Sequence, residues 1–330
     1  PLESLKSLPA PVLSDAEPEK EVEGEEESST PFSLEATEAP TPVDSAPPPP
    51  TQASLGEIVL HAAEDSIFFC RHFFPKTFRQ ESPQFHREIW SLLDDPGKRY
   101  VNLQVMRGGA KTTILRTYTA KRIAYGLSRT ILYIGASEKK ALASIRWIKR
   151  QIEFNKPFTS TFGLKPGKPW SDSDLQVIHG TEGHSIAVLG MGITGSVRGI
   201  NIDDYRPDLI IIDDVVGDDN SATDEQREKI KDLVLGALKE SLSPRSETPD
   251  AKMVILNTPR DFNDVSSQAL KDTQFASARF GCWTKETEDL PIELQESNWP
   301  ERWSSLELRE EKNAAISRNS LSIFARENEC

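Results

Sequence analysis

Cysteine is scarce in this chain: Cys70, Cys282 and Cys330 are the three among 330 residues, and none lies in a C-x-x-C or zinc-binding spacing. A sparse, odd-numbered set favours a reducing compartment and argues against a disulfide scaffold or a structural metal. Long apolar runs are missing as well, since none reaches the ~18 residues that a membrane-spanning helix needs. No signal-peptide pattern is visible either. We therefore expect no membrane span and no membrane partner.

Basic residues are outnumbered, with 39 Lys and Arg against 52 Asp and Glu and a net charge of −13. The imbalance is concentrated in residues 1–56, where twelve acidic residues and two lysines contribute −10 and leave −3 for the rest. The same segment holds eleven of the 23 prolines. Because it cannot bury enough apolar surface to offset its chain entropy, we predict a disordered acidic, Pro-rich tail over residues 1–54. This acidity does not argue against a nucleic-acid partner for the remaining chain.

After the tail, the spacing of apolar residues alternates between helical and strand patterns. Helices are expected over residues 54–69, 82–93 (Ser82 as cap, Pro83 at the first helical position), 111–125 (stopped by Gly126), 137–154 (Ser137 as cap) and 223–242 (capping box at Thr223). Strands are expected over residues 101–105, 130–134, 175–178, 185–189, 209–212 and 253–256, with the third and fourth forming a hairpin. This order predicts an α/β fold with a mainly parallel central sheet flanked by helices on both faces.

One segment joins an expected strand to an expected helix: residues 101–113 read VNLQVMRGGAKTT. In a small-residue loop at this position, the backbone N–H groups point to one spot at the positive end of a helix dipole. Phosphate groups are bound at such a spot. Lys111 is then expected to reach the β- and γ-phosphates, and Thr112 to ligate Mg²⁺. The match to G-x-x-x-x-G-K-[ST] is incomplete, because Val105 and Ala110 take the two glycine positions. Taken alone, the segment is also compatible with an ordinary glycine turn before a helix.

Two other strands end in polar residues: residues 209–214 read LIIIDD and residues 253–260 read MVILNTPR. With a phosphate loop upstream, Asp213 is expected to hold Mg²⁺ and Asp214 to orient the attacking water. Asn257 and Thr258 would place an amide and a hydroxyl near the γ-phosphate, where they sense its loss. The plain alternatives are a polar turn after one strand and termination of the other by Thr-Pro.

A fourth motif, residues 190–199 (GMGITGSVRG), holds four glycines and one arginine. A loop this rich in glycine is either mobile or closely approached by another part of the protein or by a ligand. Arg198 would meet a bound phosphate or a neighbouring subunit there, and a solvated loop arginine is the equal alternative.

The order of these motifs resembles the ATPase domain of the large terminase subunit, the DNA-packaging motor of tailed bacteriophages. The resemblance rests on residues 82–90 (SPQFHREIW), 107–113 (RGGAKTT), 196–199 (SVRG), 211–214 (IIDD) and 256–259 (LNTP). Residues 299–303 and 324–327 are similar to the segment that joins this ATPase to its nuclease in the family. The resemblance runs from roughly Ser54 to the C-terminus and implies a P-loop NTPase fold.

The resemblance also implies roles for single residues. Gln84 would contact the base or ribose, Arg107 would stabilise charge on the transferring phosphoryl group, and Arg198 would act in trans on the next subunit. Phe85, Ile89 and Trp90 beside Gln84 are equally explained as helix core. The expected catalytic set is Asp214, Arg107, Arg198 and Thr258, the last as part of the coupling motif. The expected nucleotide contacts are Gln84, Arg107, Gly108, Gly109, Ala110, Lys111, Thr112, Thr113 and Asn257, with Mg²⁺ on Thr112 and Asp213.

Two departures from the family stand out. The second acid after the strand is Asp214 where the family usually has Glu, so Asp218 or Asp219 could share its task. Only about 70 residues follow Pro259, too few for a nuclease fold. We therefore expect a P-loop ATPase domain over residues 55–290, a lid or linker segment over residues 291–330, and no nuclease activity from this chain.

The function that the resemblance implies is an ATP- and Mg²⁺-dependent motor that hydrolyses ATP and translocates double-stranded viral DNA into a procapsid. Its expected partners are double-stranded DNA, the portal protein, the small terminase subunit and further copies in a ring, expected to be a pentamer. Its expected location is the cytoplasm of the infected bacterial host, transiently at the portal vertex of the procapsid. A helicase-type P-loop ATPase and a nucleotide-gated, non-catalytic assembly module docking to the portal remain as alternatives.

Overall fold

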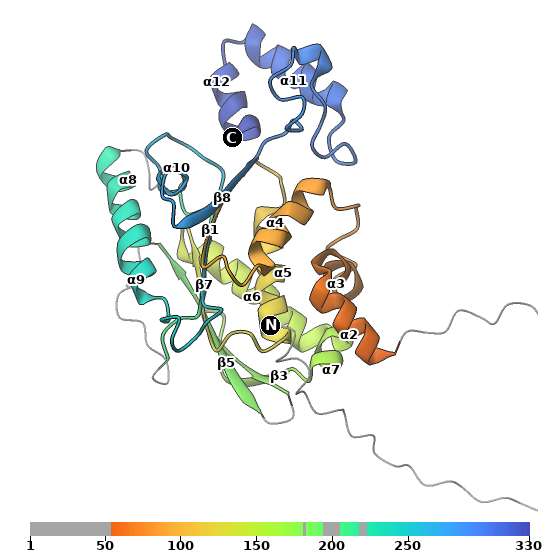
Figure 1. Ribbon diagram of the computed structural model, residues 1–330, viewed down its shortest axis with the longest axis vertical. Helices are drawn as coiled ribbons and strands as arrows, with labels where there is room; N and C mark the ends of the chain where they lie inside the picture. Colours follow the sequence, from red (N-terminus) through yellow and green to blue (C-terminus); the bar gives the residue numbers. More distant parts are fainter. Residues whose placement is uncertain (1–53, 181–182, 194–204, 218–222) are drawn as a thin grey trace, which may run out of the picture. The chain divides into compact units, whose positions relative to one another are not determined.

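A mostly parallel eight-stranded sheet with the order β3-β4-β5-β2-β6-β7-β1-β8 runs through the computed structural model of the chain (Figure 1). The structure describes residues 54–180, 183–193, 205–217 and 223–330. Residues 1–53 of the predicted tail, Arg198, Asp218 and Asp219 lie outside the described residues. The strands are β1 (Tyr100–Val105), β2 (Thr130–Gly135), β3 (Lys165–Trp170), β4 (Asp174–His179), β5 (His184–Gly192), β6 (Leu209–Asp213), β7 (Lys252–Asn257) and β8 (Phe275–Phe280).

Strands β5, β2, β6, β7, β1 and β8 pair in parallel, whereas β3, β4 and β5 pair antiparallel and form one edge of the sheet. Alternate side chains of each central strand enter different cores, because successive residues of a strand face opposite sides. Ile131 and Tyr133 of β2 lie in the core on one face, and Leu132 and Ile134 lie in the core on the other. A sheet buried on both faces explains why these strands are apolar throughout.

Helices cover both faces of the sheet, as the sequence predicts. Helices α4, α5 and α6 contact β1, β2, β5 and β6 from one side, and α10 with the α8–α9 segment covers the other (Figure 1). The helices are α2 (Leu55–Glu64), α3 (Ser66–Phe73), α4 (Gln84–Asp94), α5 (Lys111–Ala124), α6 (Glu138–Phe154), α7 (Lys156–Phe162), α8 (Asp224–Lys231), α9 (Lys239–Ser241), α10 (Val265–Ala269), α11 (Ser305–Ser317) and α12 (Leu321–Phe324). Shorter turns are the π-helical η1 (Asp232–Leu238) and η3 (Ala325–Glu329) and the 3₁₀ turn η2 (Ile292–Leu294). The expected α/β class is confirmed.

Several helix boundaries follow the predicted caps and others do not. Ser137 caps α6, and the capping box at Thr223 opens α8, which continues through η1 to Ser241. The single helix expected over residues 54–69 is two helices, because the Asp65 side chain accepts the amides of Ile67 and Phe68 and starts a new helix. The second predicted helix begins one residue late, since Pro83 is the cap rather than the first helical residue.

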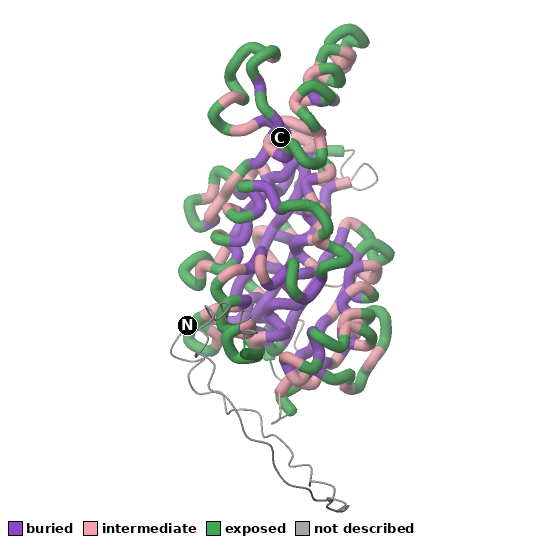
Figure 2. The backbone as a smooth tube through the Cα atoms, turned by 90° about the vertical axis from the view of Figure 1, so that its right-hand side faces the viewer, coloured by how far each residue is buried: buried purple, intermediate pink, exposed green. Residues whose placement is uncertain are grey.

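Buried residues are concentrated in the centre of the described unit (Figure 2). Residues from Ser54 onward form one compact unit, in which α11 and α12 bury little apart from Leu308 and Phe324.

None of the helices in the described ranges has the length and apolarity that crossing a membrane would require. The boundary expected near residue 290 stays a prediction.

Candidate functional site

The loop between β1 and α5 is built as a tight turn that leads into the N-terminus of a 14-residue helix. Gly108 has φ +78° and Ala110 has φ +63°, both in the left-handed region. Gly109 lies so close to its own turn that a Cβ atom would come within 2.5 Å of the Val105 side chain. The amide of Gly109 donates to the Met106 carbonyl at 3.1 Å and closes the turn. This is the geometry that an anion-binding loop at a helix N-terminus requires.

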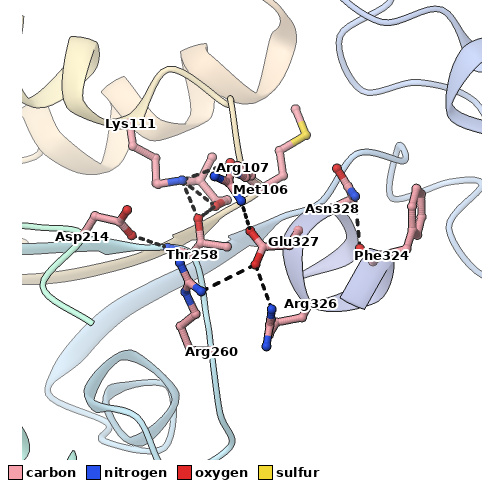
Figure 3. Close-up of polar contacts among 11 residues, drawn as sticks. Met106, Arg107, Lys111, Asp214, Thr258, Arg260, Phe324, Arg326, Glu327 and Asn328 are labelled. Carbon is pink, nitrogen blue, oxygen red and sulfur yellow. Dashed lines mark hydrogen bonds and ion pairs between the residues drawn. The ribbon is translucent and has the colours of Figure 1, made fainter. Parts of the chain in front are cut away.

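Lys111, the first residue of α5, turns its ammonium group back over the loop (Figure 3). It donates to the carbonyls of Val105 at 3.3 Å and Met106 at 3.2 Å and to the Thr258 hydroxyl at 2.5 Å. Burial lowers the pKa of Lys111, and the negative charge of Asp214 acts in the opposite direction. The cation is therefore held by neutral oxygens, which a phosphate can replace.

Asp213 is buried at the end of β6 and both of its oxygens accept hydrogen bonds. Thr112 donates to Oδ1 at 3.1 Å, and the Tyr133 hydroxyl donates to Oδ2 at 2.7 Å. Burial nevertheless dominates and raises the pKa of Asp213 to about 6. A hydroxyl and a carboxylate in contact are oxygen ligands of the kind that Mg²⁺ prefers, so Thr112 and Asp213 fit the ion that the sequence predicts there.

Asp214 follows with φ +49° and links the end of β6 to the end of β7. Its amide donates to the Leu256 carbonyl at 3.0 Å, and its Oδ1 accepts the Thr258 amide at 3.1 Å.

Asn257 is fully buried, and its Oδ1 accepts the Val215 amide at 3.0 Å. Its Nδ2 finds no hydrogen-bond partner within the described part of the chain. A buried donor of this kind fits an anionic or water ligand, which would satisfy it.

Comparisons with known proteins give the following similarities. No family model matches the chain. A segment of 169 residues is 30% identical to the large terminase subunit of Enterobacteria phage T3, which is 51% of this chain and 27% of that protein's length. The chain is similar to a phage large terminase subunit. This likeness confirms the resemblance drawn from the motifs, over about a quarter of the relative's length.

Two solved structures are also similar to this chain. The ATPase domain of the large terminase of Thermus phage P74-26 has a TM-score of 0.47 at 11% identity, covering 76% of this chain and 98% of that chain. A mutant of the same domain has a TM-score of 0.45 at 12% identity, covering 70% of this chain and 87% of that chain.

The terminase-like motifs converge in space as the sequence analysis expects for the phosphate loop and both strand ends. Lys111 and Thr112 come together with Asp213, Asp214 and Thr258, and these five residues come from three different parts of the chain. Thr113 lies in the first turn of α5, where its carbonyl accepts the Thr117 hydroxyl at 2.8 Å. Gln84 is exposed at the start of α4, and His86, two residues further on, contacts the loop at the Gly109 carbonyl. All of these roles stay predictions.

Arg107 points to the C-terminal segment of the terminase-like chain (Figure 3). Its Nη1 lies 3.3 Å from Oε2 of Glu327, and its amide donates to the Glu327 carbonyl at 2.7 Å. Arg260 and Arg326 approach the same carboxylate at 3.7 and 3.2 Å. The Glu327 side chain is 12% exposed, whereas that of Arg107 is 73% exposed. One carboxylate thus gathers three guanidinium groups beside the phosphate loop.

Three residues of the site were not found by sequence reasoning: Glu327, Tyr133 and His86. Glu327 lies in a segment that the resemblance singles out, but nothing in residues 324–327 marks it as a partner of the loop. Tyr133 sits in an apolar strand, where it is indistinguishable from a core aromatic. His86 lies in residues 82–90, which the resemblance singles out, but the resemblance implies no role for it.

Proposed function

We propose that this chain is the ATPase part of a DNA-packaging terminase, which binds ATP with Mg²⁺ at the pocket around Lys111 and hydrolyses it. The observation that carries this proposal is the convergence of a phosphate-loop lysine with the two acids at the end of β6, which lies two strands away from β1 in the sheet. Lys111 is joined through Thr258 to Asp214, and Thr112 donates to Asp213, the residue that precedes Asp214 in the chain. The chain covers only part of its relative, so activity, substrates and partners are inferred from the site.

Each residue has a task that its position supports. Lys111 would exchange its bonds to the loop carbonyls for bonds to the β- and γ-phosphates, and the loop amides would surround the same oxygens. Thr112 and Asp213 would hold Mg²⁺, which neutralises charge on the phosphates when bound. Asp214 would orient the attacking water, and the Asn257 amide would donate to the γ-phosphate or to that water. Arg107, released from Glu327, would stabilise charge on the transferring phosphoryl group.

Hydrolysis would be coupled to movement through the end of β7. The Thr258 amide and hydroxyl contact Asp214 and Lys111 respectively, so loss of the γ-phosphate changes both of its partners at once. The proposed motor translocates double-stranded DNA, mainly through phosphate contacts that are independent of sequence and sensitive to salt. Its partners would be the portal protein, the small terminase subunit and further copies in a ring, with Arg198 supplied in trans, in the cytoplasm of the infected host.

The test is the ATP hydrolysis rate of the wild type, Lys111→Ala and Asp214→Asn, each with and without duplex DNA. Lys111→Ala should lose ATP binding, and Asp214→Asn should bind ATP but hydrolyse it at least about a hundredfold more slowly. Lys76→Ala removes an exposed lysine outside the pocket and serves as the matched control.

Three outcomes would contradict parts of this proposal. If Lys111→Ala hydrolysed ATP at the wild-type rate, the assignment of the site to the pocket around Lys111 would be wrong. Binding without turnover in the wild type would favour the docking module, and strand separation on forked DNA would favour a helicase.

A further inference from the structure

His86 is a buried residue of the first turn of α4, with 2% of its surface exposed, and it touches the phosphate loop. Its Nε2 lies 3.2 Å from the carbonyl oxygen of Gly109. A carbonyl can only accept, so Nε2 carries the proton and donates it. The ring therefore binds the loop through one directed hydrogen bond.

The position of the Gly109 carbonyl fixes the direction of the next amide. The Gly109–Ala110 peptide is trans, since the cis bond in the described residues is Lys168–Pro169. In a trans peptide the carbonyl and the following N–H point to opposite sides. With its oxygen held by His86, this peptide turns the Ala110 N–H away from α4. Ala110 is the N-cap residue of α5, and free amides at the N-terminus of a helix can bind an anion.

The imidazole is itself held on several sides. Phe85 and Trp299 pack edge-to-face against it, with ring centroids 4.4 and 4.7 Å away. Arg302 lies over the Trp299 ring, and Trp303 packs against Gly108 so closely that a Cβ there would lie 2.6 Å from the indole. Burial lowers the pKa of His86 to about 4, and the charge of Arg302 acts in the same direction, so the ring is neutral near pH 7.

We propose that His86 is a positioning residue for nucleotide binding, which holds the Gly109 carbonyl so that the Ala110 amide faces the bound phosphates. The proposal rests on the proposed function, because it needs an ATP-binding loop. It predicts that a donor at the position of Nε2 is required for ATP affinity and that the ring itself is not. The effect falls on binding rather than turnover, because a loop amide contacts the phosphates before and after the reacting bond breaks.

The test compares His86→Phe, which keeps the ring and removes the donor, with His86→Gln, whose amide nitrogen reaches the position of Nε2. His179→Phe is the matched control, because His179 makes a similar ring bond to the Ala124 carbonyl at 2.8 Å at the other end of α5. For each variant the dissociation constant of ATP with Mg²⁺ and the kcat are measured beside a thermal unfolding curve. If His86→Phe does not fold, His86→Asn replaces it, since its amide is one methylene too short to reach Gly109.

We expect His86→Phe to bind ATP about tenfold more weakly with kcat changed less than threefold, and His86→Gln to stay within threefold of the wild type. His179→Phe should lower stability without changing ATP affinity. Equal ATP affinity of His86→Phe and the wild type would overturn the inference. An equal loss of ATP affinity in His86→Phe and His86→Gln would also overturn it, because it would show that His86 acts only through packing. If the wild type binds no ATP, the proposed function fails and the inference fails with it, whereas normal wild-type binding isolates the role of His86.

Discussion

Lys111 donates a hydrogen bond to the Thr258 hydroxyl at 2.5 Å, although the two residues are 147 positions apart in the chain. The same hydroxyl donates to the Val105 carbonyl at 3.2 Å, which Lys111 also contacts. Thr258 thereby ties the last residue of β1 and the first residue of α5 to the end of β7. A ligand that draws Lys111 away would break this triangle, so a ligand in the loop would act on β7 through a direct contact.

Thr258→Val tests this contact, because valine keeps the branched shape and removes the hydroxyl. We expect the kcat for ATP to fall about tenfold, because Lys111 would lack the Thr258 hydroxyl to which it returns once the γ-phosphate has left. A hydrogen bond to a charged group is worth about 1.5–3 kcal/mol, and each 1.4 kcal/mol is about tenfold. Thr258→Ser keeps the hydroxyl and should stay within about threefold of the wild type on the same scale. Steady-state hydrolysis assays measure both, and equal rates for Val and Ser would show that the hydroxyl has no part in turnover.

Glu327 is the counter-charge for Arg107, Arg260 and Arg326, so its neutralisation should leave three cations close together. We expect Glu327→Gln to lower the melting temperature at low salt by about 2–5 °C. The deficit should shrink in 0.5 M salt, because a Debye length of about 4 Å screens the repulsion. Thermal unfolding at two salt concentrations measures this, with the exposed Glu301→Gln as control. A deficit independent of salt would point to lost packing instead of charge.

Asp213 should make the stability of the nucleotide-free protein depend on pH. Burial raises its pKa from 3.8 to about 6, so the folded state binds the proton more tightly than the unfolded state does. Its contribution to stability is therefore fully present below pH 3.8 and is lost as the pH rises through about 6. Asp213→Asn removes the buried charge and should raise the free energy of unfolding at pH 7.5 by about 3 kcal/mol.

Urea unfolding in EDTA at pH 7.5 and pH 4 checks this sign, because the gain from Asp213→Asn should disappear at the lower pH. Addition of Mg²⁺ at pH 7.5 should stabilise the wild type and leave Asp213→Asn unchanged, since the amide carries no charge for the ion. An Asn variant that is less stable than the wild type at pH 7.5 without Mg²⁺ would contradict the expected cost of the buried carboxylate.

Sequence patterns predicted the elements whose signals are local and missed those decided by neighbours. The apolar strands β6 and β7 and the caps at Ser137 and Thr223 follow directly from spacing and capping chemistry. Strand β3 (KPGKPW) was missed, because two prolines and two lysines hide an edge strand that exists only through its pairing with β4. Strand β8 was missed for a similar reason, since its half-buried residues show no clear alternation and it depends on β1.

The same distinction applies to the pocket. Lys111, Thr112, Asp213 and Thr258 lie at the ends of predicted elements, so the parallel topology was enough to bring them together. Glu327 and His86 reach the loop from η3 and α4, and their contacts depend on how those segments pack, which spacing does not encode.

Ala110 occupies a position where the loop motif has glycine, and its backbone has the left-handed φ of +63° that glycine adopts easily. A left-handed conformation costs a residue with a Cβ about 1–2 kcal/mol, and glycine avoids this while losing about 0.5–1 kcal/mol of backbone entropy. We therefore expect Ala110→Gly to raise the free energy of unfolding by about 0.5 kcal/mol and to keep ATP affinity, since the amide is unchanged. Ala143→Gly in the middle of α6 is the control and should lose about 1 kcal/mol. Opposite signs in denaturant unfolding would confirm that the loop holds its anion-binding shape against the preference of its own residue, whereas equal losses would show that Ala110 is unstrained.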